Sequence, residues 1–204
     1  MENIFDFTMS ELEDRLITKG YKKFNARQVF EWLYKKKVSR FEDMSNLSKK
    51  LREYLYSNYE FATLEVETHQ SSKDGTEKFL FRLEDSNLIE TVLMRHDYGN
   101  SVCVTTQLGC NIGCSFCASG LQKKKRDLGA HEIVLQVLKV EQLTKERVSH
   151  VVVMGIGEPF DNYLTKTYSC FEGIKCLNAA LSLKNQFSLE FRWHRLYIRR
   201  YENN

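Results

Sequence analysis

Apolar residues recur at helical spacing through residues 1–58 and then change to an alternating pattern. Thr8 and Glu11 form a capping-box pattern ahead of Leu12, and Gly20 is a suitable C-cap, which predicts a first helix. The same capping logic at Asn25 predicts a second helix. The apolar residues expected to face inward from the second and third helices are Val29, Phe30, Leu33, Leu47, Leu51 and Leu55.

From about residue 60 the apolar positions alternate with polar ones, which predicts strands. The segments 61–68 and 78–83 alternate, and the sequence KDGT at 73–76 between them is a hairpin signal. Two further strands are predicted over 88–95 and 101–106. This part of the chain is therefore expected to begin a sheet.

A helix and a buried strand follow. Residues 130–144 have an amphipathic helical pattern, and residues 148–154 are apolar without alternation, as in a buried parallel strand. The apolar side of the helix is expected to carry Ile133, Val137, Val140 and Leu143. Strand, loop, helix and strand then make a right-handed βαβ unit, which assigns the chain to the α/β class.

Glu90 lies within the apolar strand 88–95, on the opposite face from Ile89 and Thr91. A carboxylate among apolar strand residues can serve as a general base with a raised pKa. A plain charge on an edge strand is the alternative, and spacing alone favours it.

Composition narrows the class of protein. The chain has 204 residues, of which 42% are hydrophobic and 28% charged, with a net charge of +3. This balance indicates a globular protein, and the mild net charge does not by itself indicate nucleic acid. The N-terminus lacks the pattern of a signal peptide, and no apolar run is long enough for a membrane span. We therefore expect a cytoplasmic protein without membrane contact.

Three cysteines, Cys110, Cys114 and Cys117, are spaced C-x3-C-x2-C, and Gly109 and Gly113 make their loop flexible. Thiolates are preferred ligands of iron–sulfur clusters, and three ligands leave one iron of a four-iron cluster open to a small molecule. This is the arrangement of radical S-adenosylmethionine (SAM) enzymes. A structural zinc site and chance buried thiols are the alternatives, but no second ligand pair lies at a fitting distance and the loop is polar.

The strand 148–154 leads into the sequence Met-Gly-Ile-Gly-Glu-Pro at 154–159. Its glycines allow the backbone to approach a ligand closely, and Glu158 can accept a hydrogen bond from an ammonium group. Alone this is a weak turn signal. One βα unit after the cysteine loop, it is where a second loop would meet SAM at the open iron.

Basic residues accumulate at 19–37 and 123–126 and in the tail 191–201. In the first segment aromatic residues, including Tyr21, Phe24, Trp32 and Tyr34, alternate with lysines, a pattern suited to gripping RNA phosphates and stacking on bases. A solvated basic face is the alternative, and the sequence alone favours it. For 123–126, a polyanion site and a solvated loop are equally supported.

Together these motifs resemble the RlmN family of radical SAM RNA methyltransferases, to which the Cfr enzymes are related. The resemblance covers about residues 1–163. It is carried by the sequences FNARQ at 24–28, WLY at 32–34, IETV at 89–92, VCVTTQLGC at 102–110, the cysteine triplet and MGIGEP at 154–159.

The resemblance implies a role for each matching residue. Cys110, Cys114 and Cys117 match the ligands of a [4Fe-4S] cluster. Gly157 and Glu158 match the pair that contacts S-adenosyl-L-methionine. Glu90 matches the proposed proton acceptor, and Cys103 matches a cysteine that resolves the covalent intermediate by disulfide formation.

The activity implied is methylation of C2 of an adenine in 23S rRNA and in tRNA through a methyl-cysteine intermediate. The implied partners are these RNAs and an electron donor such as flavodoxin, and the protein is expected to be a monomer. Three alternatives remain open: a non-catalytic iron–sulfur or RNA-binding fragment, a Cfr-type C8 methyltransferase, and another radical SAM enzyme that shares this half.

The resemblance implies an α/β fold in which a small helical domain precedes the first part of a partial (β/α)6 radical SAM barrel, incomplete as given. The expected parts are an RNA-binding-type accessory domain at 1–58, a hairpin and strand connection at 59–96, the start of the barrel at 97–163 and an atypical tail at 164–204.

The resemblance stops after about residue 163, where we expect a truncation or frameshift. Cys170 and Cys176 have no matching context, so they are expected to be ordinary thiols, and the methyl-accepting cysteine is expected to be missing. The chain alone is then expected to be inactive as a methyltransferase. An unpaired edge at 148–154 is expected to make it unstable or prone to aggregation.

Overall fold

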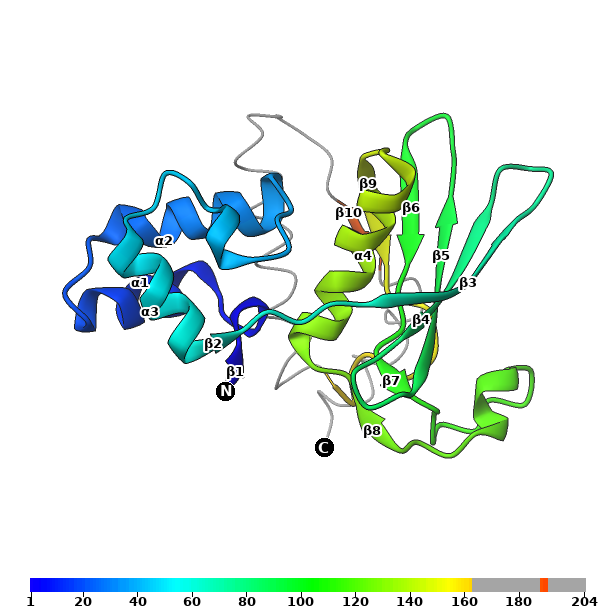
Figure 1. Cartoon of the computed structure of the whole chain (residues 1–204). Helices are drawn as coiled ribbons and strands as arrows, with labels where there is room; N and C mark the ends of the chain where they lie inside the picture. The colour runs from blue at the N-terminus through cyan, green and yellow to red at the C-terminus, as the bar shows by residue number, and fades with distance from the viewer. Residues whose placement is uncertain (163–187, 191–204) are drawn as a thin grey trace.

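The structure is a computed structural model that describes residues 1–162 and 188–190. A helical module lies on one side and a six-stranded sheet on the other, with α4 (Ala130–Thr144) between them (Figure 1). Cys170, Cys176 and the whole basic tail 191–201 lie outside the described residues. No helix in the described part of the chain has the length and apolar character needed to cross a membrane.

The helical module contains α1 (Met9–Thr18), α2 (Lys23–Phe30) and α3 (Lys49–Asn58). Its short helical turns are η1 (Ile4–Asp6), η2 (Glu31–Lys35) and η3 (Phe41–Asp43), and its short strands are β1 (Glu2–Asn3) and β2 (Tyr59–Glu60), which pair in parallel.

The capping box that begins α1 is confirmed. The backbone N–H of Thr8 donates to the Glu11 carboxylate at 2.7 Å, and the Glu11 N–H donates to the Thr8 hydroxyl at 3.3 Å. The helix ends where Gly20 takes a φ of +82°, and the Tyr21 N–H bonds back to the Leu16 carbonyl at 2.9 Å. A residue without Cβ adopts this left-handed conformation at low cost.

The predicted start of α2 at Asn25 is wrong by a few residues. The helix begins at Lys23, and the Asn25 side chain accepts a hydrogen bond from the Lys22 N–H at 3.0 Å. Asn25 thus caps the helix from within its first turn. The six residues predicted to face inward from the second and third helices are all buried.

The aromatic residues of the module mostly build its core rather than a stacking surface. Trp32 is 9% exposed and Tyr34 is 2% exposed, so the expectation that they stack on RNA bases is wrong. Phe24 is 53% exposed, and the Lys22 ammonium lies 6.0 Å from the centre of its ring.

The main sheet has the strand order β10-β9-β6-β5-β4-β3. Neighbouring strands from β3 to β6 are antiparallel, whereas β6, β9 and β10 are parallel. The strands are β3 (Glu65–Ser71), β4 (Glu77–Arg82), β5 (Leu88–Met94), β6 (Asn100–Cys103), β9 (Val148–Val152) and β10 (Ser188–Glu190). The predicted hairpin and the β6–α4–β9 unit are both present, so the α/β class is confirmed.

Two details of the sheet differ from the sequence predictions. The strand predicted at 61–68 begins only at Glu65, because Ala62 and Leu64 are buried against the core outside the sheet. The edge predicted to be unpaired at 148–154 is covered, because β10 pairs with β9 in register from Ser188–His150 to Glu190–Val152.

α4 has the predicted bounds but is not amphipathic in the expected way. Ile133, Val137 and Val140 are buried, as predicted, whereas Leu143 is 44% exposed. Val134 and Leu138 are buried as well, because the helix contacts both the sheet and the helical module.

A buried glutamine fastens α4 to the sheet. The Gln136 side-chain oxygen accepts hydrogen bonds from the Thr91 hydroxyl at 2.8 Å and the Thr105 N–H at 2.9 Å. Its Nε2 donates to the Thr105 carbonyl at 2.9 Å. Gln136 thereby satisfies polar groups of the loop after β6, which would otherwise be buried without partners.

Arg95, after β5, joins the hairpin to the turn after α4. Its guanidinium lies 2.7 Å from Glu146 Oε1 and also bonds the Glu77 carboxylate. The hydrogen bond from Arg95 is the main reason that the pKa of Glu146 is below its ordinary value. When the pKa of a carboxyl group is lower in the folded protein than in the unfolded chain, the ionised group stabilises the fold. This stabilisation is complete above the pKa of the unfolded chain and is lost as the pH falls through the pKa of the folded protein.

We expect the free energy of unfolding to fall as the pH drops below the ordinary Glu pKa of 4.5, partly because Glu146 becomes protonated. The variant Glu146→Gln should show a shallower decline, measured by urea unfolding at a series of pH values. Identical slopes for the two proteins would contradict the assignment.

Candidate functional site

The cysteine loop follows β6 and is closed at its base by a two-stranded ladder. β7 (Gln107–Leu108) pairs antiparallel with β8 (Arg126–Asp127). Just inside this ladder, the Cys110 N–H donates to the Gln122 carbonyl at 2.9 Å. Gly109 has a φ of +79°, and a Cβ there would lie 2.3 Å from the Lys123 carbonyl oxygen. Glycine is therefore required where the loop leaves the ladder.

Cys110, Cys114 and Cys117 are carried by this one loop, as predicted, and all three thiols are free. Cys110 is half-buried, and Cys114 and Cys117 are exposed. A hydrogen bond with the Ser119 side chain is the main cause that lowers the pKa of the Cys117 thiol from its ordinary value. The part of the chain that the structure describes holds no group of three or more His, Cys, Asp or Glu side chains close enough to bind a metal.

The three thiols share a loop without converging on one point. Their chemistry nevertheless fits an iron–sulfur cluster, because free thiols become thiolate ligands without the breaking of any disulfide. Gly113, between the first two cysteines, has a φ of +70° and open space around it. A Cβ on Gly113 would meet no neighbouring atom, so the space on that side of the loop is unfilled.

The glycine-rich segment after β9 packs directly on the chain that leads into the cysteine loop. The Gly155 N–H donates to the Val104 carbonyl at 3.0 Å, and the Ile156 carbonyl accepts from the Thr106 N–H at 3.0 Å. A Cβ on Gly155 would lie 2.6 Å from the Val104 carbonyl oxygen. Gly157 has a φ of +110°, and a Cβ there would lie 2.6 Å from the Cβ of Gln107.

Gln107 organises this junction, although the sequence reasoning gave it no role of its own. Its side-chain oxygen accepts a hydrogen bond from the Glu158 N–H at 2.8 Å, and its Nε2 donates to Asp127 at 2.7 Å. The side chain is fully buried. Gln107 therefore fixes the segment containing Gly157 and Glu158 against both strands of the ladder that closes the cysteine loop.

Asn162 is a second residue that the sequence reasoning missed. Its Nδ2 donates to the carbonyls of Thr106 and Leu128, both at 3.0 Å. The Glu158 carboxylate accepts from the Phe160 N–H at 3.1 Å. These bonds hold the turn after Glu158 close to the start of the cysteine loop.

Glu90 and Cys103 lie on neighbouring strands and on the same face of the sheet, opposite α4. Glu90 forms an ion pair with Lys78 at 2.9 Å, and its side chain is 43% exposed. The alternative of an edge-strand charge is wrong, because β5 lies between β4 and β6. Burial is the main cause that raises the pKa of the Cys103 thiol, and the Glu90 carboxylate raises it further.

We expect Cys103 to react with iodoacetamide more slowly than the exposed Cys114 at pH 7, because Cys103 is half-buried and burial raises the pKa of its thiol. Its rate should rise as the pH passes the ordinary thiol value, and Glu90→Gln should increase the rate modestly at pH 8. Mass spectrometry of the alkylated peptides measures both rates. Equal rates for Cys103 and Cys114 at pH 7 would contradict the difference in environment.

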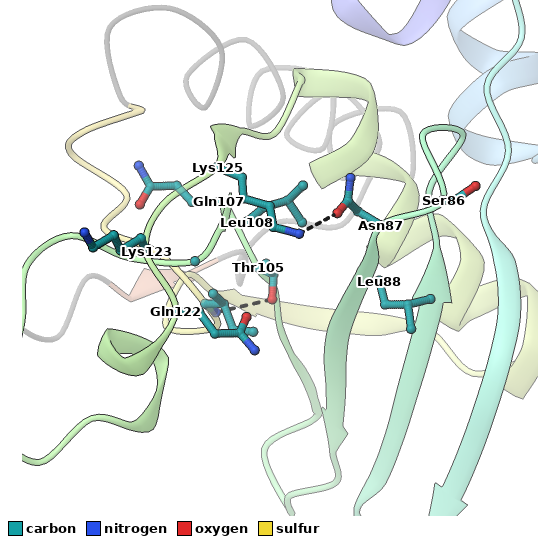
Figure 2. A pocket seen from close by; sticks show the side chains of 11 residues that line it. Ser86, Asn87, Leu88, Thr105, Gln107, Leu108, Gln122, Lys123 and Lys125 are labelled. Atoms are coloured by element: carbon teal, nitrogen blue, oxygen red, sulfur yellow. Dashed lines mark hydrogen bonds between the residues drawn. The ribbon is translucent and has the colours of Figure 1, made fainter.

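A cavity of about 330 Å³ opens between the β4–β5 turn, the β7 strand and the cysteine loop (Figure 2). Asn87 lies on one side, Gln107 and Ile156 at the junction, and Lys123 and Lys125 on the loop. Lys125 Nζ donates to the Asn87 side chain at 3.3 Å across the cavity. The cavity lies beside both segments that the sequence predicted to meet a cofactor.

Two of the four cations in the basic run 123–126 are paired with carboxylates. Lys124 pairs with Asp127 at 2.8 Å, and Arg126 pairs with Asp85 at 2.6 Å and Glu132 at 2.7 Å. The run therefore offers less positive charge for a polyanion than its sequence suggests.

Comparisons with known proteins agree with this arrangement. The family model for the ribosomal RNA large subunit methyltransferase N-terminal domain matches residues 2–61. The chain is 59% identical over 167 residues to a probable dual-specificity RNA methyltransferase RlmN from Shouchella clausii, covering 79% of this chain and 47% of that protein. It is also 59% identical over 164 residues to the Bacillus subtilis protein of the same name, covering 79% and 45%.

The crystal structure of a radical SAM methyltransferase from Sphaerobacter thermophilus is similar, with a TM-score of 0.73 and 36% identity. The match covers 87% of this chain and 52% of that chain. The chain thus spans about half the length of the relatives that it matches.

Proposed function

We propose, from the confirmed resemblance of this chain to the RlmN family, that it forms the cofactor-binding part of a radical SAM RNA methyltransferase. The observation that carries the proposal is the junction at Gln107, where the three-cysteine loop and the Gly157–Glu158 segment are fixed side by side. Cluster ligands and SAM contacts must lie this close together for one reaction.

In this proposal Cys110, Cys114 and Cys117 hold a [4Fe-4S] cluster, and Gly157 and Glu158 contact S-adenosyl-L-methionine. When bound, the cluster supplies an electron for reductive cleavage of SAM, and a flavodoxin-type donor supplies that electron to the cluster. Gly157 lacks a side chain, so its backbone is accessible for close approach. The Glu158 carboxylate is suited to an ammonium group.

Glu90 and Cys103 act on the RNA in the same proposal. Glu90 accepts a proton from C2 of the target adenine, in 23S rRNA or tRNA, while Lys78 holds the carboxylate in place. Cys103 would attack the sulfur of the methyl-carrying cysteine, so that an S–S bond forms as the S–C bond to the transferred carbon breaks. The electron pair of that S–C bond would leave with the adenine and take up a proton, which gives the methyl group. Burial raises the pKa of the Cys103 thiol, which favours its protonated form.

The helical module, residues 1–58, serves as the accessory domain that holds RNA. Support comes from its match to the N-terminal domain of large-subunit rRNA methyltransferases. The tight packing of α4 against both the module and the sheet supports a fixed relation between RNA binding and the cluster loop.

The proposal is tested by anaerobic reconstitution with iron and sulfide, followed by reduction in the presence of SAM. We expect 5′-deoxyadenosine to form and to be detected by liquid chromatography. The variant Glu158→Gln should raise the SAM concentration needed for half-maximal cleavage about tenfold, since a charged hydrogen-bond partner is lost. A reconstituted cluster that never cleaves SAM would favour the non-catalytic alternative.

A further inference from the structure

A basic crevice lies where the helical module meets the end of α4. We use this name for the space lined by Lys35, Lys36 and Lys37 on the module side and by Lys145 and Arg147 on the other side. Its volume is about 640 Å³, and it is open to solvent. The five cations come from two segments about a hundred residues apart in sequence, so the fold creates this concentration of charge.

The two carboxylates in the crevice, Glu141 and Glu146, offset only part of this charge. Glu141 is 2% exposed in its side chain, lies 2.7 Å from Lys37 Nζ, and accepts the Val148 N–H at 2.8 Å. Glu146 is engaged by Arg95 at 2.7 Å. Lys35 also pairs with the exposed Glu31 carboxylate at 3.4 Å, outside the crevice lining. The lining residues themselves hold five cations and two carboxylates, an excess of three positive charges.

The two walls of the crevice are fixed relative to each other. The Gln142 side chain donates to the Lys37 carbonyl at 2.8 Å, which joins α4 to the module. Lys37 and Lys145 both have left-handed backbones, with φ of 51° and 61°. Glycine or asparagine is usual at such positions, particularly after a helix, yet both positions hold lysine. The Lys36 ammonium lies 3.4 Å from the centre of the Trp32 ring, which restrains it further.

The crevice lies at the opposite end of the sheet from the cysteine loop. Lys145 and Arg147 precede β9, whereas the glycine-rich segment follows it, and the cysteine loop follows the parallel strand β6. In Figure 1 the end of α4 beside β9 is at the top, and the loop is at the bottom right. The length of β9 alone separates them by roughly 13 Å. The crevice is therefore separate from the candidate active site.

We propose that the basic crevice binds the phosphate backbone of a structured RNA at a point remote from the reacting base. This rests on the proposed function, which makes RNA the polyanion expected here. Lysine ammonium groups bind phosphates as point charges. The Trp32 ring beside them is buried, so it is not available to stack on a base. Binding in the crevice would therefore depend on the charge of the RNA backbone and not on its base sequence. An RNA that spans both ends of the sheet would be held at the crevice while its target base reaches the cysteine loop.

The test uses the full chain and a fluorescein-labelled RNA stem-loop, with binding followed by fluorescence anisotropy over a series of salt concentrations. The variant Lys35→Gln/Lys145→Gln removes two charges but leaves Lys37 and its buried partner in place. We expect the Kd near 0.1 M salt to rise about tenfold. The slope of log Kd against log salt should fall by about 1 to 2 units.

The matched control, Lys49→Gln/Lys73→Gln, removes the same charge from exposed lysines outside the crevice. It should change Kd less than about twofold. The charge-preserving variant Lys35→Arg/Lys145→Arg should bind like the original chain, which separates loss of charge from loss of folding. An unchanged salt slope in the glutamine variant, or an equal loss in the control, would overturn the proposal.

Failure of this proposal is distinguishable from failure of the proposed function. SAM cleavage needs no RNA and no lysine of the crevice, so it reports on the proposed function alone. If the original chain cleaves SAM and binds the stem-loop while the glutamine variant binds equally well, only the crevice proposal is overturned. If the original chain does not bind the stem-loop at all, the crevice proposal fails whatever the cleavage result.

Discussion

Replacing Cys114 with alanine is expected to abolish both cluster assembly and SAM cleavage. Cys114 is exposed at the tip of the loop between Cys110 and Cys117, so no neighbouring packing depends on it. Two remaining thiolates cannot hold three irons of a four-iron cluster. We expect iron and sulfide content to fall to background after reconstitution, and SAM cleavage to fall at least about 100-fold.

Cys103→Ala is the matched control for this experiment. Cys103 lies at the end of β6, outside the cysteine loop, and is not among the predicted ligands. The control should keep its iron, its sulfide and its ability to cleave SAM, because the proposed role of Cys103 comes after cleavage. Loss of the cluster in the control, or its retention in Cys114→Ala, would contradict the assignment of ligands.

Replacing Gln136 with leucine is expected to cause the largest loss of stability. The change leaves the Thr105 N–H and carbonyl and the Thr91 hydroxyl buried without their partner. Each of these three groups costs about 1–3 kcal/mol, so we expect a total destabilisation of at least about 3 kcal/mol. Urea unfolding followed by circular dichroism measures the difference.

Gln70→Leu provides the control for Gln136→Leu, because Gln70 is exposed on the edge strand β3. The same chemical change there should alter the free energy of unfolding by less than about 0.5 kcal/mol. A loss below about 1 kcal/mol for Gln136→Leu would show that the buried hydrogen bonds contribute little.

The sequence predicted helix ends, turns and strand faces well where these depend on residues only a few positions apart. The capping box at Thr8 and the turn at Gly20 depend on residues only a few positions apart, and both are confirmed. The alternation around Glu90 placed Ile89 and Thr91 together on the opposite face from Glu90, and the structure confirms this, with Ile89 and Thr91 on the buried face. Each of these features is determined by neighbours in the chain.

The failures involve contacts between distant segments. Leu143 is exposed and Val134 is buried because α4 lies between two structures, which its periodicity alone does not reveal. Trp32 and Tyr34 looked like a stacking surface but complete the core of the module. The pairing of β10 with β9 joins residues far apart in sequence, so the edge was wrongly expected to be open.

In the candidate site too, residues in local motifs were predicted, and residues whose role depends on distant segments were not. The cysteine spacing and the Gly-x-Gly-Glu segment were visible as motifs, and so was the strand position of Glu90. The role of Gln107 was not visible, because it depends on Glu158 and Asp127 arriving from other segments of the chain. Only the lysine run at 35–37 could be recognised in the sequence as part of the basic crevice. Lys145 and Arg147 line the same crevice because folding brings them near this run.

The central claim is that the cysteine loop holds a four-iron cluster with one iron open to SAM. Electron paramagnetic resonance of the anaerobically reconstituted, reduced chain, recorded with and without SAM, tests it most directly. We expect about four irons per chain and a signal that changes when SAM is added. A chain that binds one zinc instead of iron, or a cluster signal that SAM leaves unchanged, would contradict it.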